Sequence, residues 1–227
     1  MTRWDKFLDT FFNAKVMAKY LPDILAGTWL TIELAVLVVL SGILSGLVLA
    51  LLRSLGIRPL NWLIIFVVDL FRSLPPLVVI VMLYFGLPAA GWSPSAFVST
   101  WLSLALVLMA FAEEIFWAGI TSIAKGQWEA ARSTGLSNLQ AMIYIVLPQA
   151  VRNVLPDLLS NTLEVVKLTS LGSVVAVPEL LYQARQAQSV TFNPTPIVMA
   201  AVVYFLILWP VVRLLSRLEN RALAHRG

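Results

Sequence analysis

Cysteine, histidine and charge are scarce in this sequence, and each shortage excludes a class of protein. None of the 227 residues is cysteine, so disulfides and thiolate metal sites are excluded. The one histidine, His225, lies close to the C-terminus, where no histidine-based metal centre is expected. Only 12% of the residues are charged and 59% are hydrophobic, whereas an ordinary soluble domain has about 25% charged residues. The composition therefore predicts a membrane protein.

The net charge of +4 does not indicate a nucleic-acid partner. Basic residues beside membrane spans normally report the topology of the chain, and we expect no nucleic acid to bind. The first 20 residues are interrupted by charges and lack a long apolar core. No cleavable signal peptide is therefore expected.

A membrane-spanning helix needs about 20 mostly apolar residues. Five segments meet or approach this requirement: residues 34–52, 60–85, 95–117, 153–177 and 197–215. Pro75 and Pro76 interrupt the second segment, and residues 153–177 carry three charges. Residues 86–94 are predicted to form a loop and residues 178–196 a polar connection. The predicted fold is an all-α membrane protein with about five transmembrane helices.

Five spans place the two termini on opposite sides of the membrane, and the basic residues between spans indicate which side is which. One side would carry Arg53, Arg58, Lys125, Arg132, Arg152, Arg213, Arg217, Arg221 and Arg226. The other side would carry Arg3, Lys6, Lys15, Lys19 and Arg185. The larger set predicts a cytoplasmic C-terminus and a periplasmic N-terminus.

The first 22 residues form an amphipathic segment before the transmembrane part, which covers residues 23–220, and residues 221–227 form a cytoplasmic tail. Five apolar residues of the first segment fall largely on one helical face: Trp4, Phe7, Leu8, Phe11 and Phe12. This segment is either a helix lying in the outer membrane interface or a leader to the first span.

Small residues recur every four positions in the first span, at Gly42, Gly46 and Ala50. This spacing lets helix backbones approach closely. It indicates either a subunit interface or close packing within the chain.

A long polar loop, at about residues 120–150, is unexpected in so apolar a chain. Gly126 is predicted to end the extension of the third span, and residues 127–134 are good helix formers. Gly135 fits a helix C-cap, where a left-handed conformation costs little. Ser137 followed by Gln140 matches a capping box, which would open a second helix at 139–146 that stops around Pro148.

The residues of this loop resemble the signature of ABC importer permeases. The motif reads Glu129, Ala130, Ala131, three residues, Gly135, and then an apolar-Leu-Pro run. The flanking runs "LFRSLPPLVVIVMLYFGLP", "VLPQAVRNVLP" and "VKLTSLGSVVAVPELL" are similar to the histidine/glutamine-type polar amino acid permeases. The resemblance covers roughly residues 20–220 and implies a type I ABC importer permease.

The resemblance also implies partners. Two permease chains would pair in the bacterial inner membrane, as a homodimer or a heterodimer. Two ATP-binding subunits would dock below, and a periplasmic binding protein would deliver the amino acid. Glu129, Ala130, Ala131 and Gly135 would form the coupling helix that fits a groove in the ATPase. The chain has no G-x-x-x-x-G-K-[ST] motif, so it is not expected to be an enzyme, and ATP and Mg²⁺ would belong to the partner.

Ionisable residues at membrane depth are candidates for the substrate path. Asp69 with Arg72, and Glu164 with Lys167, are each three residues apart and could neutralise one another. Alternatively, Arg72 and Lys167 present charge to the carboxylate of an amino acid. Glu114 could attract the amino group.

Thr169 and Ser170 follow Lys167 in the family-like run and are further substrate-path candidates. The sequence departs from the family at Trp117, where an arginine is usual, and at Leu168, where an aspartate is usual. These departures suit one half of a heterodimer, or a substrate that is larger or less charged.

Two other classes compete with the importer permease. A secondary transporter would need internal repeats and an ion pathway, and no duplicated half is visible. A purely structural membrane subunit would not need the helix–turn–helix loop. Copurification of a nucleotide-hydrolysing partner would separate the permease from both alternatives.

Overall fold

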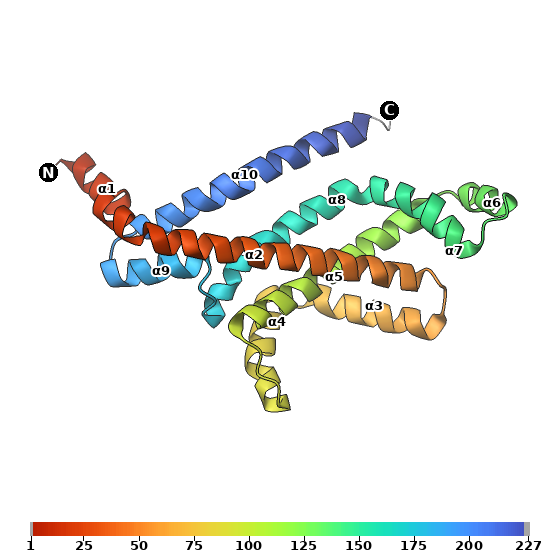
Figure 1. Cartoon of the computed structure of the whole chain (residues 1–227), viewed down its shortest axis with the longest axis horizontal. Helices are drawn as coiled ribbons and strands as arrows, with labels where there is room; N and C mark the ends of the chain where they lie inside the picture. The colour runs from red at the N-terminus through yellow and green to blue at the C-terminus, as the bar shows by residue number, and fades with distance from the viewer. Residues whose placement is uncertain (1, 225–227) are drawn as a thin grey trace. The chain divides into compact units, whose positions relative to one another are not determined.

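The computed structural model describes residues 2–224, with side chains for all of these except 214–216 and 218–224. His225, Arg226 and Gly227 of the predicted tail lie outside the described residues. The described residues form helices and no strand (Figure 1). The α-helices are α1 (Arg3–Phe11), α2 (Ala14–Arg53), α3 (Arg58–Ser73), α4 (Pro76–Val81), α5 (Ala96–Ser122), α6 (Lys125–Ser133), α7 (Asn138–Ala141), α8 (Leu147–Lys167), α9 (Leu180–Thr191) and α10 (Thr195–Ala224). The π-helical turns are η1 (Met82–Gly86) and η3 (Met142–Val146), and the 3₁₀ turns are η2 (Leu87–Ala90) and η4 (Leu168–Val175).

The chain divides into two compact units. Unit 1 consists of Met1–Val38, Pro76–Leu104 and Val166–Leu214. Unit 2 consists of Val39–Pro75, Ala105–Val165 and Leu215–Gly227. The helices α2 and α5 each belong partly to unit 1 and partly to unit 2, because the division falls inside them.

The number of helices able to cross a membrane agrees with the prediction when bent helices are counted as single spans. Three stretches are long and apolar enough by themselves: Arg3–Arg53, Ala96–Ser122 and Thr195–Arg213. Two bent pairs pass the same test together: Arg58–Ser73 with Pro76–Ala90, bent by 104°, and Asn138–Val175 with Leu180–Thr191, bent by 45°. The described residues therefore hold three to five spans, and the all-α membrane fold is confirmed.

The first span begins much earlier than the sequence suggested. Helix α2 starts at Ala14 and includes Pro22, so residues 14–22 lead directly into the span. Residues 3–11 form the separate helix α1, which opens with a capping box between Thr2 and Asp5. The amphipathic segment therefore contains both a separate helix and a leader.

Three predicted boundaries are wrong, each because a helix tolerates a residue that often ends one. Gly126 does not end the third span, because α5 stops at Ser122 and α6 already contains Gly126. Pro148 does not stop a helix, because the wider turn η3 precedes it and α8 carries it in its first turn, where a missing N–H is tolerated. Residues 86–94 are not wholly a loop, since η1 and η2 reach Ala90.

Helix α9 replaces most of the polar connection predicted at 178–196. Its residues Leu180, Ala184 and Ala187 are buried at helical spacing and its polar residues lie mostly on the other side. A short amphipathic helix has the same overall composition as a polar loop, which is why composition alone misread it. In unit 1, α9 packs with α2 and α10 around Ile24 and Met199.

The small residues of the first span pack within the chain. A Cβ atom added to Gly46 would lie 2.6 Å from Cβ of Ala112 and 2.8 Å from the backbone oxygen of Met109, and one added to Gly42 would lie 2.8 Å from Cβ of Leu108. Helices α2 and α5 therefore touch backbone to backbone in unit 2. Of the two explanations for the spacing, internal packing is confirmed.

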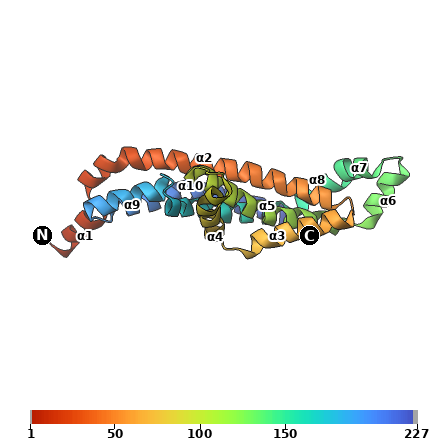
Figure 2. The same ribbon diagram turned by 90° about the horizontal axis from the view of Figure 1, so that it is seen from below.

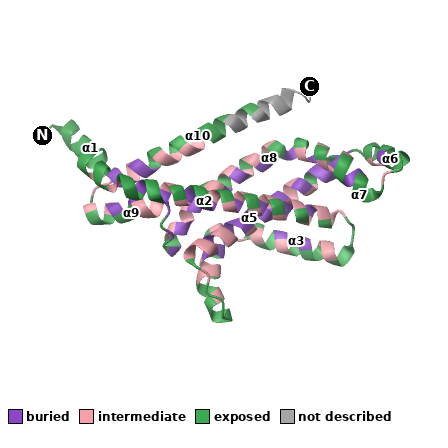
Figure 3. Ribbon diagram, in the orientation of Figure 1, coloured by how far each residue is buried: buried purple, intermediate pink, exposed green. Residues whose placement is uncertain are grey.

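The core of unit 2 continues from this contact toward the polar loop. Figure 3 shows buried positions along α5 and α8. The cluster contains Ala50, Ala112, Phe116, Ile120, Ile123, Met142, Val146, Ala150, Val154 and Leu158. Because it reaches from α2 to η3, it fixes the base of the polar loop to the apolar helices.

Candidate functional site

The polar loop is a rigid turn between two helices. Helix α6 ends at Ser133, and Gly135 follows with a φ of +87°. The Gly135 N–H donates to the carbonyl of Arg132 at 3.0 Å, and the Leu136 N–H donates to the carbonyl of Ala131 at 3.4 Å. These two bonds form a Schellman motif, so the predicted C-cap at Gly135 is confirmed.

The second helix of the loop begins as predicted and then continues into α8. The side chain of Ser137 accepts from the Gln140 N–H at 3.3 Å, and the Gln140 side chain accepts from the Ser137 N–H at 2.9 Å. This capping box opens α7. Figure 2 shows α7 between α6 and the beginning of α8. The turn η3 joins them, so a shift of the loop acts directly on α8.

The predicted coupling residues do not all face the same way. Glu129 and Ala130 are exposed on α6, whereas Ala131 is buried. The Ala131 side chain is therefore not available to a groove in the ATPase, and its carbonyl belongs to the Schellman motif. Ala131 holds the turn, and Glu129 with Ala130 remains available to a partner.

Trp128 attaches α6 to the core of unit 2, against which its half-buried side chain packs. A cavity of about 530 Å³ lies beside it. Its lining consists of Leu51, Ser54, Leu55, Trp128, Asn138, Leu139, Met142 and Ile143. The α6–α7 hairpin therefore contacts the end of α2 only partly, and Trp128 and Met142 provide its connection to the apolar core.

Four charged side chains from three helices form a network in unit 2. The Nη1 atom of Arg53 lies 3.1 Å from both carboxylate oxygens of Glu113 and 3.0 Å from Oε1 of Glu114. Nη1 of Arg72 lies 3.4 Å from Oε2 of Glu114. The guanidinium of Arg53 also stacks over the ring of Trp117, at 4.5 Å from its centroid. Two cations and two anions are thus balanced among α2, α3 and α5.

The members of this network differ in exposure. The Glu113 side chain is 0% exposed and that of Arg53 is 13% exposed, whereas Arg72 and Glu114 are 37% and 35% exposed. A buried carboxylate needs a partner, since removing one member of a buried pair costs about 3–5 kcal/mol. Arg53 and Glu113 form the structural half of the network, and Arg72 and Glu114 form its accessible half.

The ion pair of Arg72 differs from the one considered in the sequence. Arg72 pairs with Glu114 on α5, while the exposed Asp69 makes no ion pair among the described residues. Residues three apart on a helix can reach each other, but here the neighbouring helix offers a closer carboxylate. The prediction that Asp69 neutralises Arg72 is therefore wrong.

Lys167, Thr169 and Ser170 lie together in unit 1, at the change from α8 to η4. Lys167 is exposed and Thr169 is fully buried. The Thr169 hydroxyl donates to the carbonyl of Val166 at 2.8 Å, and the Ser170 hydroxyl donates to that of Lys167 at 2.9 Å. Both hydroxyls thus bond the backbone at the tightening turn, and Lys167 provides the charge of this group.

Sequence reasoning missed two buried carboxylates with long-range partners. It treated Arg53 as a flank of the first span and did not pair it with Glu113. It also placed Glu179 in a polar connection, whereas this buried side chain accepts from the N–H groups of Leu181 and Tyr182 and from the Tyr204 hydroxyl at 2.9 Å. Acidic residues are enriched near helix N-termini, so Glu179 is a local signal for the start of α9. No local signal points to Tyr204, which is 25 positions away.

No group of three or more histidine or acidic side chains able to hold a metal ion occurs in the part of the chain that the structure describes. The arrangement instead offers an exposed polar turn anchored to an apolar bundle, with a charge network inside the bundle.

Comparison with known proteins shows which family this chain is similar to. The model of the family described as "Binding-protein-dependent transport system inner membrane component" matches residues 42–223. The chain is 34% identical over 210 residues to the "Probable amino-acid ABC transporter permease protein YckA" of Bacillus subtilis (strain 168), covering 92% of this chain and 91% of the relative. It is 36% identical over 182 residues to the "Probable glutamine ABC transporter permease protein GlnM" of the same organism, covering 80% and 84%.

A solved structure gives the same result for the fold. The chain matches one described as "Crystal structure of an amino acid ABC transporter with histidines" with a TM-score of 0.81 and 35% sequence identity. The match covers 90% of this chain and 96% of the other.

The Arg53–Glu113 pair generates a stability prediction. Replacing Arg53 by Met leaves Glu113 buried without its cation, and the free energy of unfolding should fall by about 3–5 kcal/mol. The double variant Arg53→Met/Glu113→Gln removes both charges and should recover much of this loss. Thermal unfolding of the purified chain in detergent measures the effect.

Arg58→Met is the matched control, because Arg58 is exposed at the start of α3 and outside the network. A surface change of this kind should stay within about 0.5 kcal/mol. Equal melting temperatures for Arg53→Met and Arg58→Met would show that the buried pair contributes nothing.

Proposed function

The chain belongs to the family of binding-protein-dependent transport system inner membrane components, and from this membership we propose that it carries a polar amino acid across the bacterial inner membrane. Its relatives are permease subunits of ABC transporters and not enzymes. The chain is accordingly the membrane subunit of such a transporter. Hydrolysis of ATP with Mg²⁺ takes place in a separate partner subunit.

One observation carries the proposal: the exposed, capped helix–turn–helix of α6 and α7. Connecting two spans needs only a few residues, whereas this segment has its own Schellman motif and capping box. Such preorganised elements fit a partner with little loss of conformational entropy. The partner is the ATP-binding subunit, and Glu129 accepts a charge-assisted hydrogen bond from it.

The assembly that follows is a pair of permease chains, two ATP-binding subunits below them and a periplasmic binding protein above them. Uptake requires all three kinds of subunit, because the binding protein delivers the substrate, the permease chains carry it across, and the ATPase moves the coupling segment. The continuous helix from α7 through η3 to α8 supports this route for the motion, because it leads from the docking turn to Lys167.

The substrate is a polar amino acid or a close derivative, as the names of the relatives suggest. Lys167 binds its carboxylate, because the charge is exposed where α8 tightens into η4. Arg72 instead keeps Glu114 neutralised. Glu114 is therefore a weaker candidate for the substrate's amino group than its sequence position suggested.

The coupling role of Gly135 predicts a defect that spares folding in the membrane. A side chain at Gly135 would meet no atom within 4 Å, but the φ of +87° disfavours any residue with a Cβ, by about 1–2 kcal/mol. Gly135→Val should therefore deform the turn, lowering uptake and substrate-stimulated ATPase activity while the protein still inserts.

Gly126→Val is the control for this variant. Gly126 also faces open space, but its φ is not positive, so uptake should remain close to normal. Normal uptake by Gly135→Val as well would remove the turn from the coupling route.

The topology predicted from the basic residues has a direct test. The proposal requires a cytoplasmic C-terminus, because the α6–α7 turn must face the ATPase on the same side. A reporter active only in the periplasm should be silent when fused after Gly227 and active when inserted between residues 86 and 94. The opposite pattern would put the docking turn on the wrong side.

The two candidate cations should differ in transport kinetics. A charge-assisted contact is worth roughly 1.5–3 kcal/mol, so Lys167→Met should raise the apparent KM for uptake at least about tenfold. Arg72→Met should leave KM nearly unchanged, because Glu114 keeps Arg53 as a partner.

Arg152→Met serves as the control for a surface cation on α8. An equal rise in KM for Arg72→Met would assign the substrate contact to Arg72. Full recovery of uptake in Glu164→Gln/Lys167→Met would show that Lys167 only neutralises Glu164.

A further inference from the structure

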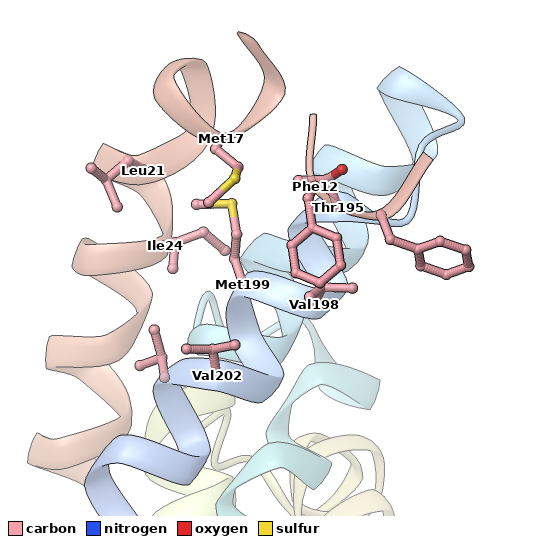
Figure 4. A pocket seen from close by; sticks show the side chains of 10 residues that line it. Phe12, Met17, Leu21, Ile24, Thr195, Val198, Met199 and Val202 are labelled. Atoms are coloured by element: carbon pink, nitrogen blue, oxygen red, sulfur yellow. The ribbon is translucent and has the colours of Figure 1, made fainter. Parts of the chain in front are cut away.

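An apolar crevice of about 200 Å³ lies in unit 1, between the α1–α2 corner and α10. Phe12 borders it at the corner, Met17 and Ile24 line it from α2, and Met199 and Val202 line it from α10. Figure 4 shows Met17 and Met199 pointing toward each other across the crevice. The coupling turn and the charge network belong to unit 2 and contribute no residue to this crevice.

The crevice offers nothing for a polar ligand or for water. Thr195 is its one polar lining residue, and the Asn13 N–H donates to its hydroxyl oxygen at 3.1 Å. The same hydroxyl donates to the carbonyl of Thr10 at 3.3 Å. A buried water needs two to four polar partners. The occupant must therefore be apolar.

The mouth of the crevice continues into the exposed apolar faces of two candidate spans. Leu21 and Leu25 on α2 are 47% and 55% exposed, and Val202 and Leu206 on α10 are 49% and 63% exposed. In a bilayer, such faces contact lipid hydrocarbon. The crevice therefore opens toward acyl chains.

The size of the crevice selects a thin occupant. A helix with its side chains is about 10–12 Å wide, too wide for a space of about 200 Å³. The space is instead large enough for a short length of a single thin chain. Left empty, its walls would lose their dispersion contacts. A flexible polymethylene chain meets all of these conditions.

Helix α1 provides the neighbouring element suited to the membrane interface. Its exposed Trp4 and Phe7 rings stack at 5.4 Å between centroids, and Phe7 and Phe11 lie 5.0 Å apart. Tryptophan gathers at the level of lipid headgroups, and Trp4 is exposed here. Because Phe11 also lines the crevice, α1 lies next to its entrance.

We propose that this crevice binds one acyl chain of a membrane phospholipid and so joins the α1–α2 corner to α10. The bound chain fills the space that the lining side chains, Met17 and Met199 among them, leave open. The site requires only that the chain lies in a bilayer, and it is independent of the transported substrate and of ATPase docking.

Photocrosslinking with a defined lipid tests the site. The full-length chain is reconstituted in vesicles of phosphatidylethanolamine and phosphatidylglycerol, with a trace of phosphatidylglycerol that carries a diazirine midway along one acyl chain. After illumination, mass spectrometry should find lipid on Met17 and Met199 at several times the yield on Leu206 and Trp29, which are exposed but outside the crevice.

Filling the crevice with a larger side chain should remove the higher crosslinking yield at the crevice residues. Val202→Trp and Met17→Trp block it from opposite walls, and each should reduce crosslinking at Met199 to the level seen at Leu206. Leu206→Trp, one turn away on α10, should leave it unchanged. Two blocking variants keep the test valid if one of them fails to insert.

Two outcomes would overturn the proposal. Equal yields at crevice and off-crevice positions in the unaltered chain would mean ordinary lipid contact without a site. Lipid-free Met17 and Met199 that instead crosslink to a second protein chain would assign the crevice to a subunit interface.

Discussion

The buried carboxylate of Glu113 is the constraint on which the arrangement of unit 2 depends. A side chain with 0% exposure cannot keep its charge without a cation, and Arg53 supplies one at 3.1 Å from both oxygens. Gly46 lets α2 lie against α5 beside this pair, with no room there for a side chain. Glu114 then extends the network to Arg72 and so includes α3. Close helix packing and charge balance therefore require each other.

Features encoded within a few residues could be predicted from the sequence. Gly135 and the Ser137 capping box are local signals, and the structure has both. The break at Pro75 and Pro76 is also where the sequence put it. Contacts between distant residues could not be predicted in this way. Arg53 and Glu113 are 60 positions apart, and no local pattern tells a span flank from a buried partner.

The errors share one physical cause, which is that helix formation depends on packing as well as on composition. The composition of α9 is that of a polar loop, and only the burial of Leu180 and Ala184 on one face shows that the segment is a packed helix. Ala131 reads as part of a docking face, although a neighbouring helix position, Ala130, is the exposed one. Thus the sequence indicated a helix–turn–helix segment that the structure contains, and only the packed structure shows which of its side chains are exposed.

The π-helical turn η3 affects the direction in which the α6–α7 turn faces, measured around the axis of α8. A π turn is equivalent to one residue added to an α-helix, and one residue corresponds to about 100° of rotation about the axis. Because η3 lies between α7 and α8, its five residues set the direction in which the preceding loop faces relative to α8. Deletion of a single residue between Met142 and Val146 would keep the helix continuous before Pro148. It would also rotate the α6–α7 turn about the helix axis, so that the turn faces another direction relative to α8. The number of residues in η3 therefore determines the direction of the turn, and a substitution, which leaves that number unchanged, cannot cause the same rotation.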